Sequence, residues 1–136
     1  MAENRNITYN LTFKVNPNVT SVAKLILQSQ DLSSGKWQSD PPNEIKVANA
    51  GDSIKVTFKA SGRACTATGV GGSVVYKGTD PDDTVYTLKF EIPYSEANSG
   101  NLTGGSTYYD TTGGKVPISG NSVTVDVTIT QTKPII

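Results

Sequence analysis

The chain has 136 residues, with twelve basic and twelve acidic side chains, no histidine and one cysteine. This length suits a single domain with one core. The lack of histidine removes the commonest general base and metal ligand, a single cysteine excludes an internal disulfide, and the balanced charge argues against nucleic acid as a partner.

The first residues do not have the pattern of a signal peptide, which leaves a chain made without a leader or a mature form whose leader has been removed. Residues 1–6 are polar and contain no apolar core segment, so they do not resemble a signal peptide. No apolar run approaches the roughly 20 residues that a membrane-spanning helix needs. We therefore expect a chain that is made in soluble form.

Alternation of apolar and polar residues predicts strands with one buried and one exposed face. The pattern is regular near the N-terminus, irregular in residues 22–28, and interrupted by Pro117 in residues 115–118. In chain order, the predicted strands are 7–15, 22–28, 44–48, 54–60, 71–76, 85–92, 115–118 and 123–130.

Turn-forming sequences separate these strands about every 8–12 residues, which is typical of a sandwich or barrel. The fold class is therefore all-β, an antiparallel β-sandwich forming a single domain over residues 1–136. We expect residues 1–6 and 132–136 to be frayed. The glycine-rich stretch 95–107 is predicted to be a long loop, and loops of that length are often functional.

Few residues suit catalysis. Glu91 and Glu96 flank the 95–107 loop, and paired carboxylates hydrolyse glycosides, but alternation puts Glu91 on the outward face of its strand. Cys65 has no histidine to activate it. We therefore expect no enzyme and no catalytic residue.

Two motifs have the chemistry to bind ions. Asp80, Asp82 and Asp83 could hold Ca²⁺ with loop carbonyls, although an acidic turn containing proline needs no ion. Ser61 to Arg63 could offer backbone N–H groups and a guanidinium to a phosphate, but a Ser-Gly step is also an ordinary end of a strand. No metal site and no cofactor is expected.

Aromatic side chains are more informative. Rings at one end of a sandwich suit a lipid headgroup layer, and tyrosine clusters can enclose a quaternary ammonium. Trp37 has the alternative role of plugging one end of the core. The candidate membrane- or ligand-binding residues are Trp37, Arg63, Tyr94, Tyr108 and Tyr109.

Several short motifs follow one another between about Thr20 and Thr130. They are Gly35-Lys36-Trp37 with Pro41-Pro42 and Ile45, then Phe58–Arg63, Thr68–Tyr76, Leu88–Tyr94 with Asn98, and Gly120–Val125. In order and spacing this set resembles the aegerolysin family, small β-sandwich proteins of fungi and bacteria. It is also similar to the small component of certain bacterial binary insecticidal toxins, which belongs to that family.

The resemblance implies an aegerolysin/actinoporin-like sandwich that binds a membrane lipid or receptor and recruits a larger pore-forming partner. In fungal members the lipid is typically a sphingolipid headgroup or a related phospholipid, bound with several tryptophans, whereas this chain has only Trp37. The insect-directed bacterial branch is the nearer likeness. Such a protein would be made without a signal peptide in a bacterial or fungal cytoplasm, released, and act at the target membrane as a monomer or homodimer.

The leading hypothesis places Trp37, Tyr94, Tyr108 and Tyr109 as anchors at one docking end, with Arg63 as a phosphate or partner contact. One alternative is a carbohydrate-binding module or lectin. Another is a structural or adhesive domain whose edge strand pairs with a second chain.

Overall fold

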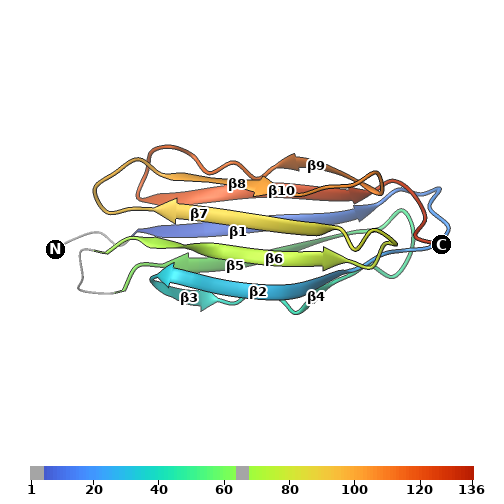
Figure 1. Cartoon of the computed structure of the whole chain (residues 1–136), viewed down its shortest axis with the longest axis horizontal. Coiled ribbons are helices and arrows are strands. Elements are labelled where there is room, and N and C mark those ends of the chain that lie inside the picture. The colour runs from blue at the N-terminus through green and yellow to red at the C-terminus, as the bar shows by residue number, and fades with distance from the viewer. Residues whose placement is uncertain (1–4, 64–67) are drawn as a thin grey trace.

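The computed structural model describes residues 5–63 and 68–136, which form a two-layer β-sandwich without helices (Figure 1). The prediction of an all-β sandwich is confirmed. The strands are β1 (Asn6–Val15), β2 (Leu25–Ser34), β3 (Lys36–Ser39), β4 (Glu44–Ile45), β5 (Ser53–Ser61), β6 (Val70–Gly78), β7 (Val85–Ile92), β8 (Ser99–Thr103), β9 (Tyr109–Gly113) and β10 (Ser122–Gln131).

Each layer is a five-stranded sheet. One sheet, the β1 sheet, has the order β3-β5-β1-β10-β9, and the other, the β6 sheet, has the order β4-β2-β6-β7-β8. Neighbouring strands are antiparallel except for β1 and β10, which run parallel in the centre of the β1 sheet. The first and the last strands of the chain are therefore direct neighbours.

The core follows from the alternation in the sequence. Alternate residues of each central strand point inward, so that two dry faces pack against each other and the intervening polar residues meet water. Tyr9 lies near the middle, with its ring stacked on Phe58 at 5.2 Å and edge-on to Phe90 at 5.7 Å. Aromatic rings from both sheets thus hold the layers together.

Three short strands were missed by the sequence pattern, and one predicted strand is wrong. β3, β8 and β9 are four or five residues long, largely polar and exposed, so no apolar alternation marks them. The predicted strand 115–118 instead runs beside β8, where Val116 N donates to Gly100 O and Ile118 O accepts from Asn98 N. Pro117 has no N–H to extend this pairing.

The irregular second strand also lies further along than predicted. β2 runs to Ser34, and its pairing with β6 shifts between Leu27 and Ser29 and again between Leu32 and Ser34. Each shift inserts a residue and breaks the alternation, which is what a β-bulge does. The polar second half of β2 therefore gave no strand signal.

The C-terminal segment makes hydrogen bonds to the rest of the sandwich. Thr132 N donates to Tyr108 O at 2.9 Å, and the N–H groups of Ile135 and Ile136 donate to Ser21 Oγ at 2.8 and 3.0 Å. Ile135 also packs against the core. The expectation for the first residues lies mostly outside the described part of the chain.

The sandwich has two ends with different contents. The Tyr94 end, on the left in Figure 1, carries Arg5, the turn at Gly35 and the segments 93–98 and 116–121. The Asp80 end, on the right, carries the connections 16–24, 46–52, 79–84 and 104–108 together with the C-terminal segment.

Candidate ligand-binding end

A hollow of about 350 Å³ opens at the Tyr94 end. It lies between the segment that follows β7 and the segment that precedes β10, with the first described residue of the chain as a third wall. The lining residues are Arg5, Pro93, Tyr94, Glu96, Ala97, Asn98, Ile118, Ser119, Gly120 and Asn121.

Arg5 and Tyr94 form one wall of this hollow. Arg5 Nη2 donates to Tyr94 O at 2.7 Å, and the guanidinium carbon lies 4.5 Å from the centroid of the Tyr94 ring. The backbone of Arg5 is fixed in turn, because Gly62 N donates to Arg5 O at 2.8 Å. A cation–π contact of this kind positions the charge beside the ring.

The opposite wall is held by Asn98. This buried side chain donates from Nδ2 to Gly120 O at 2.9 Å, and its backbone N–H donates to Ile118 O at 3.0 Å. The two bonds fix the segment that presents Ile118, whose side chain is 69% exposed. Exposing an isoleucine to water to this extent is unfavourable, and transferring it into an apolar phase lowers the free energy.

The hollow therefore combines four kinds of surface within one loop cluster. Arg5 supplies a cation, Glu96 an anion, the 37% exposed Tyr94 an amphipathic ring, and Ile118 an apolar wedge. Such a set can contact a polar headgroup and the edge of an apolar layer together.

Trp37 also lies at the Tyr94 end, but it belongs to the core. Its ring is edge-on to Phe58 at 6.4 Å and to Phe90 at 6.2 Å, and Nε1 donates to Gln30 O at 3.3 Å. The side chain is half-buried between the two sheets. This geometry matches the alternative interpretation of Trp37 as a plug, and leaves only part of the ring for any ligand.

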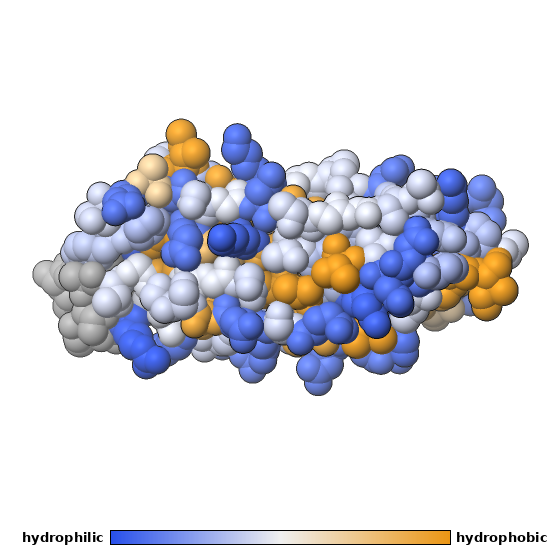
Figure 2. Space-filling model, in the orientation of Figure 1, coloured by the Kyte–Doolittle hydropathy of each residue, from blue (hydrophilic) through white to orange (hydrophobic). Residues whose placement is uncertain are grey.

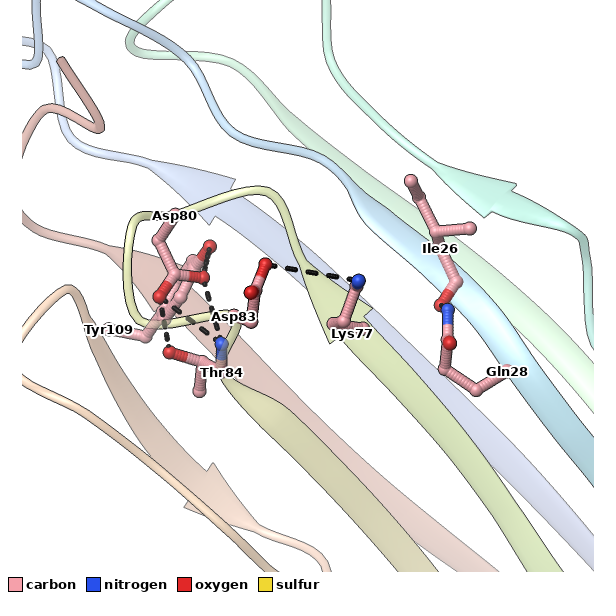
Figure 3. Close-up of polar contacts among 7 residues, drawn as sticks. All are labelled: Ile26, Gln28, Lys77, Asp80, Asp83, Thr84 and Tyr109. Atoms are coloured by element: carbon pink, nitrogen blue, oxygen red, sulfur yellow. Dashed lines mark hydrogen bonds and ion pairs between the residues drawn. The ribbon is translucent and has the colours of Figure 1, made fainter.

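Tyr108 and Tyr109 lie at the opposite end, so the hypothesis of one docking end with all four rings is wrong. Tyr109 is 4% exposed and donates its hydroxyl to Asp80 Oδ1 at 2.9 Å (Figure 3). Tyr108 is half-buried against the core, and its carbonyl accepts from Thr132. Strand pairing separates these residues from Tyr94, because Tyr109 pairs with Gln131 at the far end of β10.

The sequence profile of the aegerolysin family matches residues 10–132, nearly the whole chain. The chain belongs to the aegerolysin family. Its aegerolysin fold is shared with solved structures of low identity. The RahU protein, solved in complex with a TRIS molecule, has a TM-score of 0.59 and 14% identity, with 92% of this chain and 95% of that chain covered.

Two further structures align over a similar length of the aegerolysin. IP-1A from Alcaligenes faecalis has a TM-score of 0.57 and 18% identity, covering 91% of this chain and 90% of that chain. The lipid binding protein Nakanori has a TM-score of 0.55 and 10% identity, covering 90% of this chain and 69% of that chain. A search of curated proteins found no match.

The acidic turn of this aegerolysin is tied into the fold by hydrogen bonds to Asp80. Asp80 accepts from Thr84 N at 3.2 Å, from Thr84 Oγ1 at 2.6 Å and from Tyr109 (Figure 3). Burial alone would raise the pKa of Asp80, but these hydrogen bonds hold it below its ordinary value. Asp83 lies 3.8 Å from Lys77, and no metal-ligand cluster occurs in residues 5–63 and 68–136.

The remaining candidates from the sequence are the Ser61 to Arg63 motif and Cys65. Ser61 is buried and its hydroxyl accepts from Gln38 Nε2 at 2.6 Å, while the N–H of Gly62 is used by Arg5. The Ser61 hydroxyl and the Gly62 N–H that could have faced a phosphate are therefore bonded within the protein. Arg63 is exposed at the Tyr94 end, and Cys65 lies outside the described residues. Within those residues, no helix is long and apolar enough to cross a bilayer.

Sequence reasoning identified Tyr94 but missed Arg5, Asn98 and Ile118 as parts of the same aegerolysin site. Arg5 lies in a stretch expected to fray, and Ile118 was assigned to a strand. One signal was available: Ile118 is an isolated large apolar residue between Pro117 and the turn at Gly120. An apolar residue in such a polar turn has no core to enter.

Proposed function

We propose that this chain is the membrane-binding component of a two-component pore-forming toxin. It docks on a membrane lipid or receptor and recruits a larger pore-forming partner, with insect cells as the target. Membership of the aegerolysin family supports the proposal. The structural likeness to Nakanori, a lipid binding protein, points in the same direction.

The observation that carries the proposal is the exposed Ile118 beside the hollow of Arg5 and Tyr94. On docking, Ile118 enters the edge of the acyl region while the Tyr94 ring lies at the headgroup level. Arg5 and Glu96 then face the polar part of the lipid. A zwitterionic headgroup suits this pair, because it carries one charge of each sign.

A larger partner is invoked because the sandwich uses its apolar side chains internally. The large apolar residues of the central strands lie in one buried cluster between the sheets. A 14.4 kDa domain with balanced charge therefore has recognition surfaces to offer rather than a surface for lining a pore. Partner dependence is measured as dye leakage from vesicles with and without the candidate partner. Strong leakage caused by the purified chain alone contradicts this part of the proposal.

The docking end is tested by co-sedimentation with vesicles of phosphocholine, phosphoethanolamine or phosphoserine lipids. Ile118→Ser should lower the partition coefficient about tenfold, since a buried apolar side chain of this size contributes roughly 1.5 kcal/mol. Val85→Ser is the matched control, because Val85 is 46% exposed on the β6 sheet at the Asp80 end. Equal losses for both variants, or binding to none of the vesicles, contradict docking by the Tyr94 end.

The insect-directed role is tested separately on cultured insect and mammalian cells. With the partner present, the protein should permeabilise insect cells at lower concentration than mammalian cells. Ile118→Ser should reduce this activity in parallel with vesicle binding. Equal potency on both kinds of cell argues against the insecticidal role while leaving lipid docking intact.

A further inference from the structure

Strand pairing places four polar side chains in one row across the outer face of the β6 sheet. Asp31 of β2 pairs with Ser73 of β6, Ser73 with Lys89 of β7, and Lys89 with Asn101 of β8. Adjacent strands are about 4.8 Å apart, so this polar row is roughly 14 Å long. The row lies on the side of the sandwich, away from the hollow of Tyr94.

The surface along the polar row is concave. A hollow of about 450 Å³ covers the half lined by Asp31, Leu32, Ser73 and Lys89, and a second of about 340 Å³ covers the half lined by Lys89 and Asn101. The two hollows share Lys89 and Glu91 as lining residues, so they lie next to each other across the sheet, and together they are called the groove. Each volume falls in the range of small-molecule sites. Figure 2 shows this face as pale and blue surface with small orange patches.

The polar row has donors and acceptors to offer. Within the described chain, the side chains of Asp31, Ser73 and Lys89 make no hydrogen bond and no ion pair. Lysine brings donors only, a carboxylate brings acceptors only, and hydroxyl and amide groups bring both. A ligand in the groove therefore meets both kinds of partner along its whole length.

Glu91 is held at the side of the row. Ser33 Oγ donates to Glu91 Oε1 at 3.3 Å, and a Cβ on Gly71 would collide with the carboxylate. The missing side chain of Gly71 thus makes room for the acid. The Glu91 carboxylate is therefore positioned beside Lys89, while the Asp31 carboxylate lies at the β2 end of the row.

The composition of the groove excludes several ligand classes. One lysine against two carboxylates gives no attraction for nucleic acid. Leu32 is the one large apolar residue among the lining residues, too little for an acyl chain. Protein interfaces are enriched in Tyr, Trp, Met and Arg and depleted in Ser and Lys, the reverse of this surface.

We propose that this groove binds a neutral oligosaccharide. Lys89 donates to sugar oxygens, Asp31 and Glu91 accept from sugar hydroxyls, and Ser73, Thr87 and Asn101 do either. Leu32 offers apolar surface to the C–H face of a ring. The groove is long enough for a short linear chain, and its surplus carboxylate disfavours acidic sugars. The site is separate from the proposed lipid-docking end and leaves that end free to contact a membrane.

The direct test is an NMR titration of the full chain with ¹⁵N label. The probes are trisaccharides of glucose, mannose and N-acetylglucosamine, with sialyllactose as the acidic comparison. Saturable shifts confined to the polar row and its neighbours are expected for at least one neutral probe, and weaker ones for sialyllactose. No saturable shift at millimolar sugar, or shifts centred on residues 94–98 and 118–121, overturns the proposal.

Matched variants then locate the interaction. Lys89→Met should weaken binding of the best probe about tenfold, because a hydrogen bond to a charged group is lost. Lys55→Met is the control, since Lys55 is exposed on the outer face of the β1 sheet. Gly71→Ala should weaken binding by displacing the flexible Glu91 carboxylate, as Glu91→Gln should. Equal effects of Lys89→Met and Lys55→Met contradict the site.

Sugar binding in the groove and lipid docking at the Tyr94 end can be tested independently of each other. Lys89→Met should bind sugar-free vesicles as the unaltered protein does, which also shows that it is folded. If Lys89→Met abolishes binding of a protein partner while no sugar binds the unaltered chain, the groove is a protein interface and the oligosaccharide proposal is wrong. Loss of vesicle binding in Ile118→Ser with sugar binding intact leaves this site standing.

Discussion

The two ends of the sandwich are built from similar turns but used differently. At the Asp80 end, the acid is buried and surrounded by donors from Thr84 and Tyr109, and the C-terminal segment closes over Ser21. At the Tyr94 end, the Tyr94 ring and the Ile118 side chain are exposed around a hollow, beside Arg5, whose guanidinium donates to Tyr94 O. Polar groups that bond inward stabilise the fold, and groups left at the surface are available to a ligand.

This difference shows that residue type alone does not assign a role. Tyr94 and Tyr109 both stand at strand ends in the sequence. One ring is beside Arg5 in the open, whereas the other is edge-on to Tyr86 at 5.9 Å inside the protein. Tyr86 itself is 2% exposed, and this burial raises the pKa of its hydroxyl to about 12.

The largest effect is expected from Asp80→Ala. This change leaves the hydroxyl of Tyr109 and the backbone N–H of Thr84 without their acceptor, while the Thr84 hydroxyl keeps Ser106 Oγ at 2.7 Å, and it should lower the free energy of unfolding by about 3 kcal/mol. Urea denaturation measures it. Asp82→Ala, in the same turn but exposed, should change the free energy by less than about 0.5 kcal/mol. Similar values for both variants would mean that Asp80 has no special part in closing this end.

A smaller loss of stability is expected from Trp37→Ala. This residue lies at the Tyr94 end but packs in the core, so it tests whether every ring at that end is open to a ligand. Removing a half-buried indole should cost about 2 kcal/mol, and Trp37→Phe should recover more than half of it. Thermal unfolding measures both. If Trp37→Ala reduces vesicle binding without reducing stability, the ring is an anchor and not a plug.

Matched hydroxyl deletions compare the two ends directly. Tyr109→Phe removes a donor to a buried carboxylate and should lower the free energy of unfolding by about 1.5 kcal/mol. Tyr94→Phe removes an exposed hydroxyl and should change it by about 0.3 kcal/mol or less. Both are read by urea denaturation. Equal losses would contradict the description of one closed and one open end.

The smallest effect is expected from lowering the pH, because protonation weakens the hydrogen bonds of Asp80 without deleting its side chain. The unfolded pKa of an aspartate is about 3.9, and the folded pKa of Asp80 is lower, so the unfolded state binds more protons between the two values. The stability from Asp80 is therefore present above about pH 4 and lost as the pH falls through the folded pKa. Asp80→Asn should lack this part of the acid dependence, whereas Glu96→Gln should retain it.

Much of the fold was predictable from the sequence, because central strands must alternate. Tyr9 and Phe13 point inward while Thr8 and Thr12 point out, and both the strand and its burial follow from that period. Edge strands lack this constraint. The polar residues of β8 form a strand because the backbone of β7 is beside them, which no local pattern records.

The candidate site was less predictable, because its residues meet only through the topology. Arg5 and Tyr94 are far apart in the sequence, and their contact depends on β1 and β7 placing these residues on the same side of the sandwich. The direction in which each strand runs decides which loops share an end. Strand direction places Tyr94 and Tyr109 at opposite ends of the sandwich, although both are equally good candidates in the sequence.

The parallel pairing of β1 with β10 has a consequence for biosynthesis. Asn6 and Val15 lie opposite Ser122 and Gln131, so the centre of the β1 sheet stays open until β10 has left the ribosome. We expect slow completion of the β1 sheet, since contacts between residues far apart in the sequence form late. A truncated product that lacks the last strand would display an apolar, unpaired β1 edge and be prone to aggregate.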